Sequence, residues 1–265
     1  MATGNVNILT DARTSRIRVG CASWALPSAV KSRFGRGDSV LAVYATRFDA
    51  VEINSSFYRP HRRSTYQRWS ETVPDGFRFS AKLPRSITHD AGLHGVAEPL
   101  DTFIGEVSGL GDKLGALLVQ LPPGLVFDAA TAARFFAMLV RRTPAAVICE
   151  PRHRSWFEPA AIELLQRHEV ARAGVDPPQP LAAAATPGEA GRVLYWRWHG
   201  SPRIYYSGYD EQRLHAMAAA AAACGKDRAR AETWCIFDNT AAGHAVDDAL
   251  SFQALCRAQA SAADP

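Results

Sequence analysis

Several sequence features that mark common functional classes are missing from this chain of 265 residues. None of its five cysteines forms a C-x-x-C pair, and the odd count argues against a disulfide framework and against a structural zinc site. No segment matches a P-loop or a dinucleotide fingerprint, so no nucleotide cofactor is indicated. The first residues show no secretory signal pattern, and no apolar run approaches the ~18 residues that span a bilayer. We therefore expect a cytoplasmic protein with reduced thiols and no membrane partner.

Lysine is also scarce. The 30 basic residues include only four lysines, which are Lys31, Lys82, Lys113 and Lys226. Coding bias explains this, since alanine is equally abundant, and the functional alternative is a weak preference for anionic ligands such as phosphates. Against 26 acidic residues the formal net charge is +4, without a long basic run. Nucleic acid is therefore a weakly supported partner, and a small anionic molecule is the expected ligand.

The most informative feature present is a repeated alternation of strand-like and helical segments. Eight times, a short β-branched or apolar run ends in a polar residue and a helical stretch follows. This rhythm predicts an α/β fold consisting of a single (β/α)8 TIM-type barrel, whose active site is built at the carboxyl ends of the strands. The runs end at residues 20–24, 52–54, Lys82, Gln120, Glu150, Asp176, His199 and residues 238–239.

The same patterns predict the domain organisation. We expect a flexible leader over residues 1–15, one barrel domain over residues 16–257 and a flexible tail over residues 258–265. Residues 170–176 form the sixth expected strand. Residues 177–192 are rich in proline and alanine without periodicity, so a long loop is expected in place of a helix between strands six and seven.

In-out alternation along the expected strands predicts where the polar side chains point. Glu52 and Asn54 share one face of strand two, opposite Val51 and Ile53. In strand three, Ser80 and Lys82 lie on the face opposite Phe79 and Ala81. In strand five, Glu150 lies opposite Val147 and Cys149, and in strand seven Arg197 and His199 share one face. If the apolar faces meet the helices, the polar groups point into the top of the barrel. Such alignment is improbable by chance, because an ionised group buried without a partner costs several kcal/mol.

These strand-end groups form the candidate catalytic set. Its carboxylates and histidines are able to bind a divalent metal or to act as general acid and base, although no metal ligands are assigned. The alternative is a structural polar layer in which the acids pair with lysine and arginine. The predicted catalytic residues are Glu52, Lys82, His89, Glu150, Asp176, His199 and Asp238.

A second set is predicted to contact the ligand. Cations near the strand ends complement a phosphate, a carboxylate or an anionic transition state, and aromatic rings there are able to stack on a sugar or a base. Charge balance and packing at the barrel rim are the alternatives. The predicted ligand-binding residues are Trp24, Asn54, Tyr58, Arg59, Gln120, Arg152, His153, Trp156, Arg197 and Asn239.

An ordered series of sequence blocks resembles the YecE-like family of uncharacterised proteins over residues 17–255. The blocks lie at residues 19–24, 44–48, 51–59, 79–84, 87–89, 113–123, 150–157, 197–200, 206–209 and 237–240. The resemblance implies a TIM-type barrel and a domain whose function is not settled. The chain departs from the family pattern at Ser23, at residues 32–37 and at Pro151.

Three hypotheses about function follow. The leading one is an enzyme, a hydrolase or an isomerase, that acts on an anionic or sugar-like small molecule. The second is a metal-dependent phosphodiester hydrolase that acts on nucleic acid, and the third is a ligand-binding protein without catalysis. The usual barrel glycosidase has acids on strands four and seven, where this chain has Gln120 and His199, which counts against that scheme.

Overall fold

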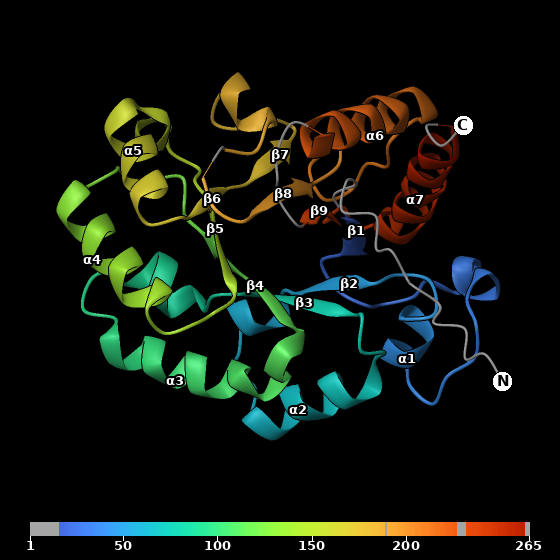
Figure 1. The fold of residues 1–265 in the computed structure, drawn as a ribbon, viewed down its shortest axis with the longest axis horizontal. Coiled ribbons are helices and arrows are strands. Elements are labelled where there is room, and N and C mark those ends of the chain that lie inside the picture. The colour runs from blue at the N-terminus through green and yellow to red at the C-terminus, as the bar shows by residue number, and fades with distance from the viewer. Residues whose placement is uncertain (1–15, 189, 227–231, 263–265) are drawn as a thin grey trace, which may run out of the picture.

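The computed structural model describes residues 16–188, 190–226 and 232–262. Strands form the centre of the molecule and helices surround them (Figure 1). The strands are β1 (Arg16–Cys21), β2 (Ala50–Ile53), β3 (Arg78–Lys82), β4 (Leu114–Gln120), β5 (Ala146–Glu150), β6 (Ala171–Arg172), β7 (Gly174–Asp176), β8 (Val193–Trp198) and β9 (Glu232–Phe237). The α-helices are α1 (Val40–Tyr44), α2 (Arg63–Thr72), α3 (Ala97–Val107), α4 (Ala129–Val140), α5 (Pro159–Arg167), α6 (Glu211–Lys226) and α7 (His244–Ala262).

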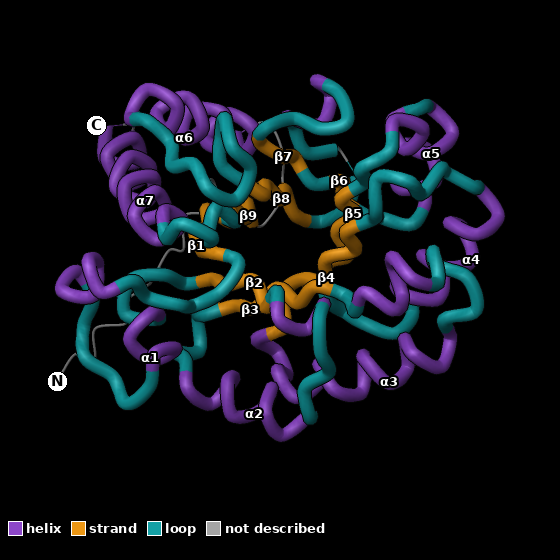
Figure 2. Tube along the Cα trace, turned by 180° about the vertical axis from the view of Figure 1, so that it is seen from behind, coloured by secondary structure: helices purple, strands orange, loops and turns teal. Residues whose placement is uncertain are grey.

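The strand pairing is parallel at every described junction. One ladder runs in the order β1-β9-β8-β7 and the other in the order β2-β3-β4-β5-β6. The expected single strand over residues 170–176 is divided at Ala173, because β6 pairs with β5 while β7 pairs with β8. Together β6 and β7 occupy the sixth strand position and connect the two ladders. The fold is the TIM-type arrangement that the sequence predicts, and Figure 2 shows its strands inside the ring of helices.

The junction between β1 and β2 is bridged by a side chain. Within the described part of the chain no backbone ladder joins these strands. The Tyr44 hydroxyl instead accepts a hydrogen bond from the Cys21 N–H at 2.8 Å and donates one to the Ala50 carbonyl at 3.0 Å. The strands approach closely here, since a Cβ on Gly20 would lie 2.1 Å from the Ala50 oxygen. Glycine at this position lets the two backbones meet.

The expected in-out alternation is confirmed by two separate apolar cores. The core inside the barrel contains Ala22, Ala50, Ala116, Leu118, Ala146, Ile148, Ala171, Ala173, Val193, Tyr195, Trp234 and Ile236. A larger core between strands and helices contains Val51, Ile53, Phe79, Ala81, Val147 and Cys149. The polar partners in alternation, Glu52, Ser80, Lys82 and Glu150, therefore share the inner face. The inner apolar side chains lie below the charged groups at the carboxyl ends of the strands, and Arg18 is a further buried charge near the start of β1, 5.8 Å from the Trp234 ring centroid.

Local sequence signals fix several helix boundaries. The Ser39 hydroxyl accepts a hydrogen bond from the Ala42 N–H at 3.1 Å and caps α1, as expected for a serine before the first turn. In the described part of residues 177–192, which leaves out residue 189, the regular structure is one short 3-10 helix, η6 (Ala182–Ala185), which agrees with the predicted long loop. The helix α7 extends to Ala262, beyond the expected domain end at residue 257. The expected leader and residues 263–265 of the expected tail lie outside the described residues.

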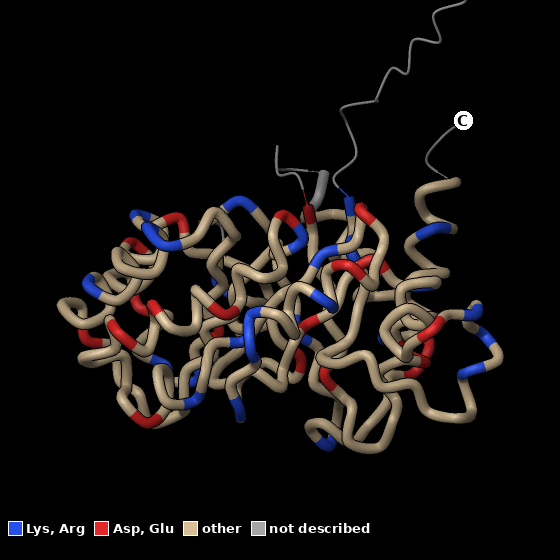
Figure 3. The backbone as a smooth tube through the Cα atoms, turned by 90° about the horizontal axis from the view of Figure 1, so that it is seen from below, with Lys and Arg blue, Asp and Glu red and all other residues tan. Residues whose placement is uncertain are grey.

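Basic and acidic residues are not separated into different regions of the described backbone (Figure 3). Basic and acidic positions alternate over the backbone seen in Figure 3. None of the described helices is both long enough and apolar enough to cross a membrane.

Candidate functional site

The carboxyl ends of the strands bring charged side chains from distant parts of the chain into one buried cluster. Glu52 comes from β2, Glu150 ends β5 and Arg197 lies near the end of β8. His199 and Asp238 directly follow β8 and β9. All five are at least nine-tenths buried. Parallel strands place their carboxyl ends at the same edge, which is why residues 39 to 145 positions apart form hydrogen bonds here.

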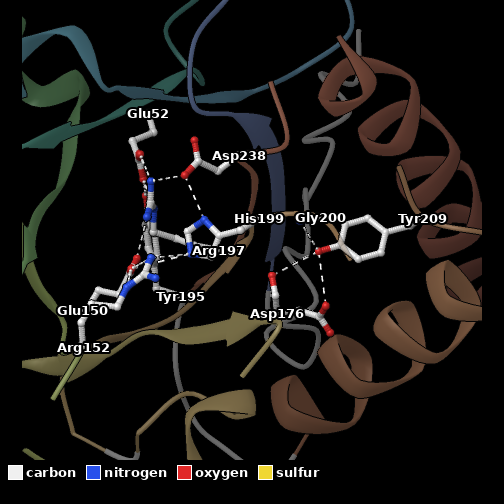
Figure 4. A network of polar contacts seen from close by, with 10 residues as sticks. All are labelled: Glu52, Glu150, Arg152, Asp176, Tyr195, Arg197, His199, Gly200, Tyr209 and Asp238. Atoms are coloured by element: carbon white, nitrogen blue, oxygen red, sulfur yellow. Dashed lines mark hydrogen bonds and ion pairs between the residues drawn. The ribbon is translucent and has the colours of Figure 1, made fainter. Parts of the chain in front are cut away.

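Arg197 is the centre of this cluster (Figure 4). Its Nε and Nη2 donate to the two carboxylate oxygens of Glu52 at 2.9 and 2.7 Å. Its Nη1 donates to Glu150 at 2.6 Å, and its Nη2 also donates to Asp238 at 2.9 Å. Tyr195 adds a hydroxyl donor to Glu52 at 3.0 Å. All three nitrogens of the guanidinium are thus engaged by carboxylates inside the barrel.

His199 lies between an acceptor and a donor. Its Nδ1 is 2.9 Å from the Asp238 carboxylate, and its Nε2 is 3.0 Å from Nη2 of Arg152. An arginine only donates, and an ionised carboxylate only accepts. In the neutral ring Nδ1 therefore carries the proton, and the lone pair of Nε2 accepts the hydrogen bond from Arg152. Arg152 also binds Glu150, with Nε 2.6 Å from its carboxylate.

Opposing effects of burial and charge decide the ionisation of the acids. Burial by itself would raise the pKa of Glu150, but the Arg152 and Arg197 guanidiniums hold that pKa well below its ordinary value. Burial likewise opposes ionisation of Asp238, and Arg197 together with His199 lowers its pKa below the ordinary value. Both groups are carboxylates near neutral pH and are unable to act as general acids there.

Lys82 differs from the other cations of the cluster. It ends β3, is 5% exposed, and places its Nζ 4.1 Å from the centroid of the Phe57 ring. Within the described residues its ammonium makes no hydrogen bond or ion pair that meets geometric criteria. Burial, followed by the charge of Arg197, lowers the pKa of Lys82 to about 8, although nearby carboxylates oppose this shift.

The structure separates Asp176 from the other predicted acids. Asp176 pairs with Arg213 of α6, and one of its carboxylate oxygens lies 3.4 Å from the Tyr209 hydroxyl. Figure 4 shows Asp176 and Tyr209 apart from the Arg197 cluster. Alternation along strand six accounts for its orientation, because Ala171 and Ala173 face the barrel interior. Asp176 is an odd number of residues further on and points to the opposite side.

His89 lies on the Lys82 side of the barrel mouth. It belongs to the short helix η3 (Ser86–Asp90), and its ring packs edge-on against Phe57 with centroids 4.9 Å apart. Its Nδ1 is 2.9 Å from the Thr88 hydroxyl. Burial and then the charge of Lys82 lower the pKa of His89, so the imidazole is neutral at pH 7.

Three predicted ligand-binding residues have structural contacts in the described chain. Trp24 packs edge-on against Trp69 at 4.9 Å between centroids. Trp156 is 1% exposed and donates its indole N–H to the Leu125 carbonyl at 2.9 Å. His153 caps the short helix η5 (Arg154–Phe157). These contacts explain each residue by packing or capping, and a role in ligand binding remains a prediction.

The other predicted contacts vary in exposure. Gln120 is half-buried beside Glu150 in the register of β4 and β5, and Tyr58 and Arg59 are exposed. Asn54 is half-buried, and its side-chain oxygen has no hydrogen-bond partner among the described residues. Asn239 is buried. Its amide nitrogen donates to the Ser207 carbonyl and to the Asp248 carboxylate of α7, neither of which belongs to the Arg197 cluster.

Two aromatic residues of the site were missed by the sequence reasoning. Tyr195 was detectable, because it shares the inner face of β8 with Arg197 two positions on. Tyr205 had no such signal. Its ring lies edge-on to His199 with centroids 5.6 Å apart, its N–H donates to the His199 carbonyl at 2.5 Å, and its φ is 69°. A left-handed backbone in a tyrosine is uncommon and costs conformational energy that the surrounding contacts must offset.

The described His, Cys, Asp and Glu side chains do not fit the divalent metal site that the sequence allowed. Within the described ranges no group of three or more His, Cys, Asp or Glu residues is arranged to hold a metal ion. The three cluster acids Glu52, Glu150 and Asp238 all direct oxygens at Arg197.

A cavity of about 740 Å³ lies elsewhere, lined by residues at the start of α3, along α4 and at the end of α5. None of its lining residues belongs to the predicted sets. The predicted catalytic residues are therefore at the carboxyl ends of the strands, and this cavity is a separate feature of the outer helices.

Fold and cluster together define a TIM-type α/β protein with a buried ion-pair network at the carboxyl ends of its strands. The chain belongs to the family described as "Protein of unknown function DUF72", whose match covers residues 18–265. It is similar to the UPF0759 protein YecE of Escherichia coli (strain K12), with 32% identity over 106 residues, which are 40% of this chain and 38% of YecE. It is also similar to the UPF0759 protein YunF of Bacillus subtilis (strain 168), with 25% identity over 155 residues. That match covers 56% of this chain and 54% of YunF.

Solved structures of the same family share the fold. A DUF72 family protein from Enterococcus faecalis V583 superposes with a TM-score of 0.74 at 20% identity and covers 91% of this chain and 95% of its own. One from Thermotoga maritima MSB8 gives 0.73 at 21% identity, with coverages of 91% and 99%. The resemblance to the YecE-like family inferred from the sequence blocks is confirmed.

Proposed function

We propose that this protein is an enzyme, an isomerase or a hydrolase, that transfers a proton on a small anionic molecule bound at the barrel mouth. One observation carries the proposal. His199 is held through Nδ1 by a buried carboxylate, while the lone pair of Nε2 points at a cationic side chain. This arrangement suits a general base whose tautomer and orientation are set by a neighbouring carboxylate.

Arg152 is the candidate anchor for the anionic group. It has an exposed fraction of 11%, against 1% for Arg197, and among the described residues its guanidinium is bound to Glu150 and His199. A ligand carboxylate or phosphate that attracts Arg152 would draw its Nη2 away from His199 and free the basic nitrogen. Ligand binding and activation of the base would then be coupled. Arginine suits this role because its planar donors match the oxygens of such anions.

Arg197 serves a different purpose in this proposal. Four of its five N–H donors are occupied by three carboxylates, so its main role is to hold the acids in place. Asp238 links Arg197 to His199, because its Oδ2 accepts a hydrogen bond from each of these two residues. Through Asp238, Arg197 therefore orients the histidine base.

The proposal is tested by NMR in deuterated water with a panel of sugar phosphates, hydroxy acids and oxo acids. An isomerase exchanges carbon-bound hydrogen for deuterium, and a hydrolase produces new resonances. We expect one of these changes in the wild type and at least a ~100-fold loss in His199→Asn, in line with removal of a general base. This variant keeps an N–H able to reach Asp238. The matched control is His215→Asn, since His215 lies on an exposed face of α6.

Thermal shift on the same panel separates catalysis from simple binding. We expect an anion to stabilise the wild type and Arg152→Gln to lose most of that response. A ligand that stabilises the protein but undergoes no exchange or turnover would identify a binding protein and reject the enzyme. Equal ligand responses in the wild type and Arg152→Gln would reject the site. For the metal-dependent nuclease hypothesis, the described residues offer no supporting donor set.

A further inference from the structure

Lys82 is the charged residue of the barrel mouth that the ion-pair network leaves out. Every other member is bound through hydrogen bonds or ion pairs, which for Glu52, Glu150 and Asp238 converge on Arg197. For Lys82 the described residues provide only an aromatic contact, with Nζ 4.1 Å from the Phe57 ring centroid. A lysine needed for charge balance would be expected to pair with one of the three acids. This one ends β3 on the inner face with its amine uncommitted.

The surroundings of Lys82 also favour the neutral amine. The charged groups that act on it are Arg197, Glu52, Asp238 and Glu150, and its own charge in turn acts on His89. Burial and Arg197 outweigh the acids and bring the pKa to about 8. At pH 7 roughly a tenth of the Lys82 side chains are then unprotonated, about 300-fold more than for a lysine with the ordinary pKa of 10.5. A desolvated lysine of this kind is a nucleophile for carbonyl carbon.

We infer that Lys82 forms a covalent imine with the carbonyl group of a small anionic aldehyde or ketone bound at the barrel mouth. This inference rests on the proposed function, since Arg152 would hold the anionic group, and it narrows the substrate class to oxo acids and related carbonyl compounds. The juxtaposition that carries it is a buried amine, unpaired among the described residues, whose charged neighbours Glu150 and Asp238 in turn bind Arg152 and His199.

The step balances without a further reactant. The lone pair of Nζ forms a bond to the carbonyl carbon, and the C=O π electrons move to oxygen, which takes up a proton. The nitrogen then loses a proton and its lone pair forms the C=N bond, while the C–O bond breaks and the oxygen leaves as water after a second protonation. The nitrogen of the resulting iminium withdraws electrons and acidifies the neighbouring C–H. A proton there is suited to removal by His199.

His89 is positioned to assist this chemistry. Its ring contacts the same face of the site as Lys82, because both side chains pack on Phe57. Burial and the charge of Lys82 keep it neutral near pH 7, so it is able to accept a proton during attack and to return one to the leaving oxygen.

The inference is tested by trapping the imine with glyoxylate and sodium borohydride. The hydride reduces the C=N bond and leaves a stable carboxymethyl group on the lysine, located by mass spectrometry of the peptides. The chain has only four lysines, so each site is resolved. Lys113 is an internal control, because its Nζ is bound by the Ser70 and Val73 carbonyls. The variants are Lys82→Arg, which keeps the charge but forms no adduct, and Lys113→Arg.

We expect Lys82 to be labelled at pH 7 at least ~10-fold more than Lys113 or the exposed Lys31. The reason is that only the unprotonated amine attacks a carbonyl, and a larger fraction of Lys82 is unprotonated at this pH. Total labelling should fall in Lys82→Arg and stay unchanged in Lys113→Arg. Equal labelling of all lysines, or none at Lys82, would overturn the inference.

Two further outcomes separate the imine from the proposed function. If glyoxylate stabilises the wild type through Arg152 and Lys82 stays unmodified, the imine is rejected and the anion site stands. If neutral acetaldehyde labels Lys82 as well as glyoxylate does, and Arg152→Gln changes neither, the imine is supported and the proposed recognition of an anion is rejected.

Discussion

Arg197 and Glu52 form a two-point ion pair entirely inside the barrel, with N–O distances of 2.9 and 2.7 Å and exposed side-chain fractions of 1% and 0%. The two residues are 145 positions apart in the chain. Burying charged groups is costly unless hydrogen bonds satisfy them, and here the arginine meets three carboxylates at once. We therefore expect the Arg197 guanidinium to contribute strongly to the free energy of unfolding, because it is the shared partner of these buried carboxylates.

Arg197→Met is therefore expected to destabilise the protein by about 3–5 kcal/mol at pH 8, because it leaves buried carboxylates without their main partner. Those acids would then take up protons more readily when folded than when unfolded. The loss of stability should accordingly be smaller at pH 5 than at pH 8. Urea unfolding at both pH values measures this. Arg85→Met, which removes an exposed ion pair with Asp90, should stay within about 1 kcal/mol, and an equally small effect of Arg197→Met would contradict the prediction.

Lys82→Met is expected to stabilise the protein at pH 7. The folded-state pKa of about 8 lies below the ordinary 10.5, so at pH 7 the folded protein must hold a proton on a buried amine. The difference of about 2.5 between the two values corresponds to about 3 kcal/mol at most. As the pH rises from 8 to 10.5, the unfolded chain binds more protons than the folded one, and wild-type stability increases relative to the variant. The advantage of Lys82→Met should thus shrink over this range, and urea titrations at pH 7, 9 and 10.5 would show it. A variant less stable than the wild type at pH 7 would argue that Lys82 supports the fold.

Much of the fold could be predicted from the sequence, because its determinants are local. The period-two pattern in β2 places Val51 and Ile53 in the outer core and leaves Glu52 inside, as expected. The division of strand six at Ala173 could not be predicted, because it depends on which neighbouring strand accepts each backbone group. The bridge by Tyr44 could not be predicted for the same reason. The helical pattern around Tyr44 does not indicate that its hydroxyl bonds the backbones of β1 and β2 where no ladder joins them.

The candidate site was predictable in position but only partly in its internal contacts. Strand ends located Glu52, Glu150 and His199 at the barrel mouth. The same rule misplaced Asp176, although alternation from the inward Ala173 would have corrected it. The pairing of Arg197 with three acids could not be read from the chain, because it requires the register of four strands and the side-chain geometry.

The tautomer of His199 is a direct test of the hydrogen-bond chain. We expect long-range proton–nitrogen NMR on histidine-labelled protein at pH 8 to show a protonated Nδ1 and an unprotonated Nε2, because Asp238 accepts and Arg152 donates. The signal is assigned by its loss in His199→Asn. Asp176→Asn should leave it in place, since Asp176 binds Arg213 instead. A proton on Nε2 would mean that Arg152 does not occupy this position in solution and that the coupling between anion binding and the base is wrong.

Tyr44→Phe tests how the barrel closes between β1 and β2. Removing the hydroxyl leaves the buried Cys21 N–H and Ala50 C=O without their partner, so we expect a loss of about 1–3 kcal/mol in the free energy of unfolding. Tyr66→Phe is the matched control, because the Tyr66 hydroxyl is also buried but makes no well-formed hydrogen bond with any residue that the structure describes, and its removal should be neutral or stabilising. Hydrogen exchange should also accelerate selectively at the Cys21 amide in Tyr44→Phe, since that amide then depends on no acceptor within the barrel. If both substitutions cost the same, the hydroxyl of Tyr44 contributes no more than its burial, and β1 and β2 are held together by the packing of α1 against the strands instead.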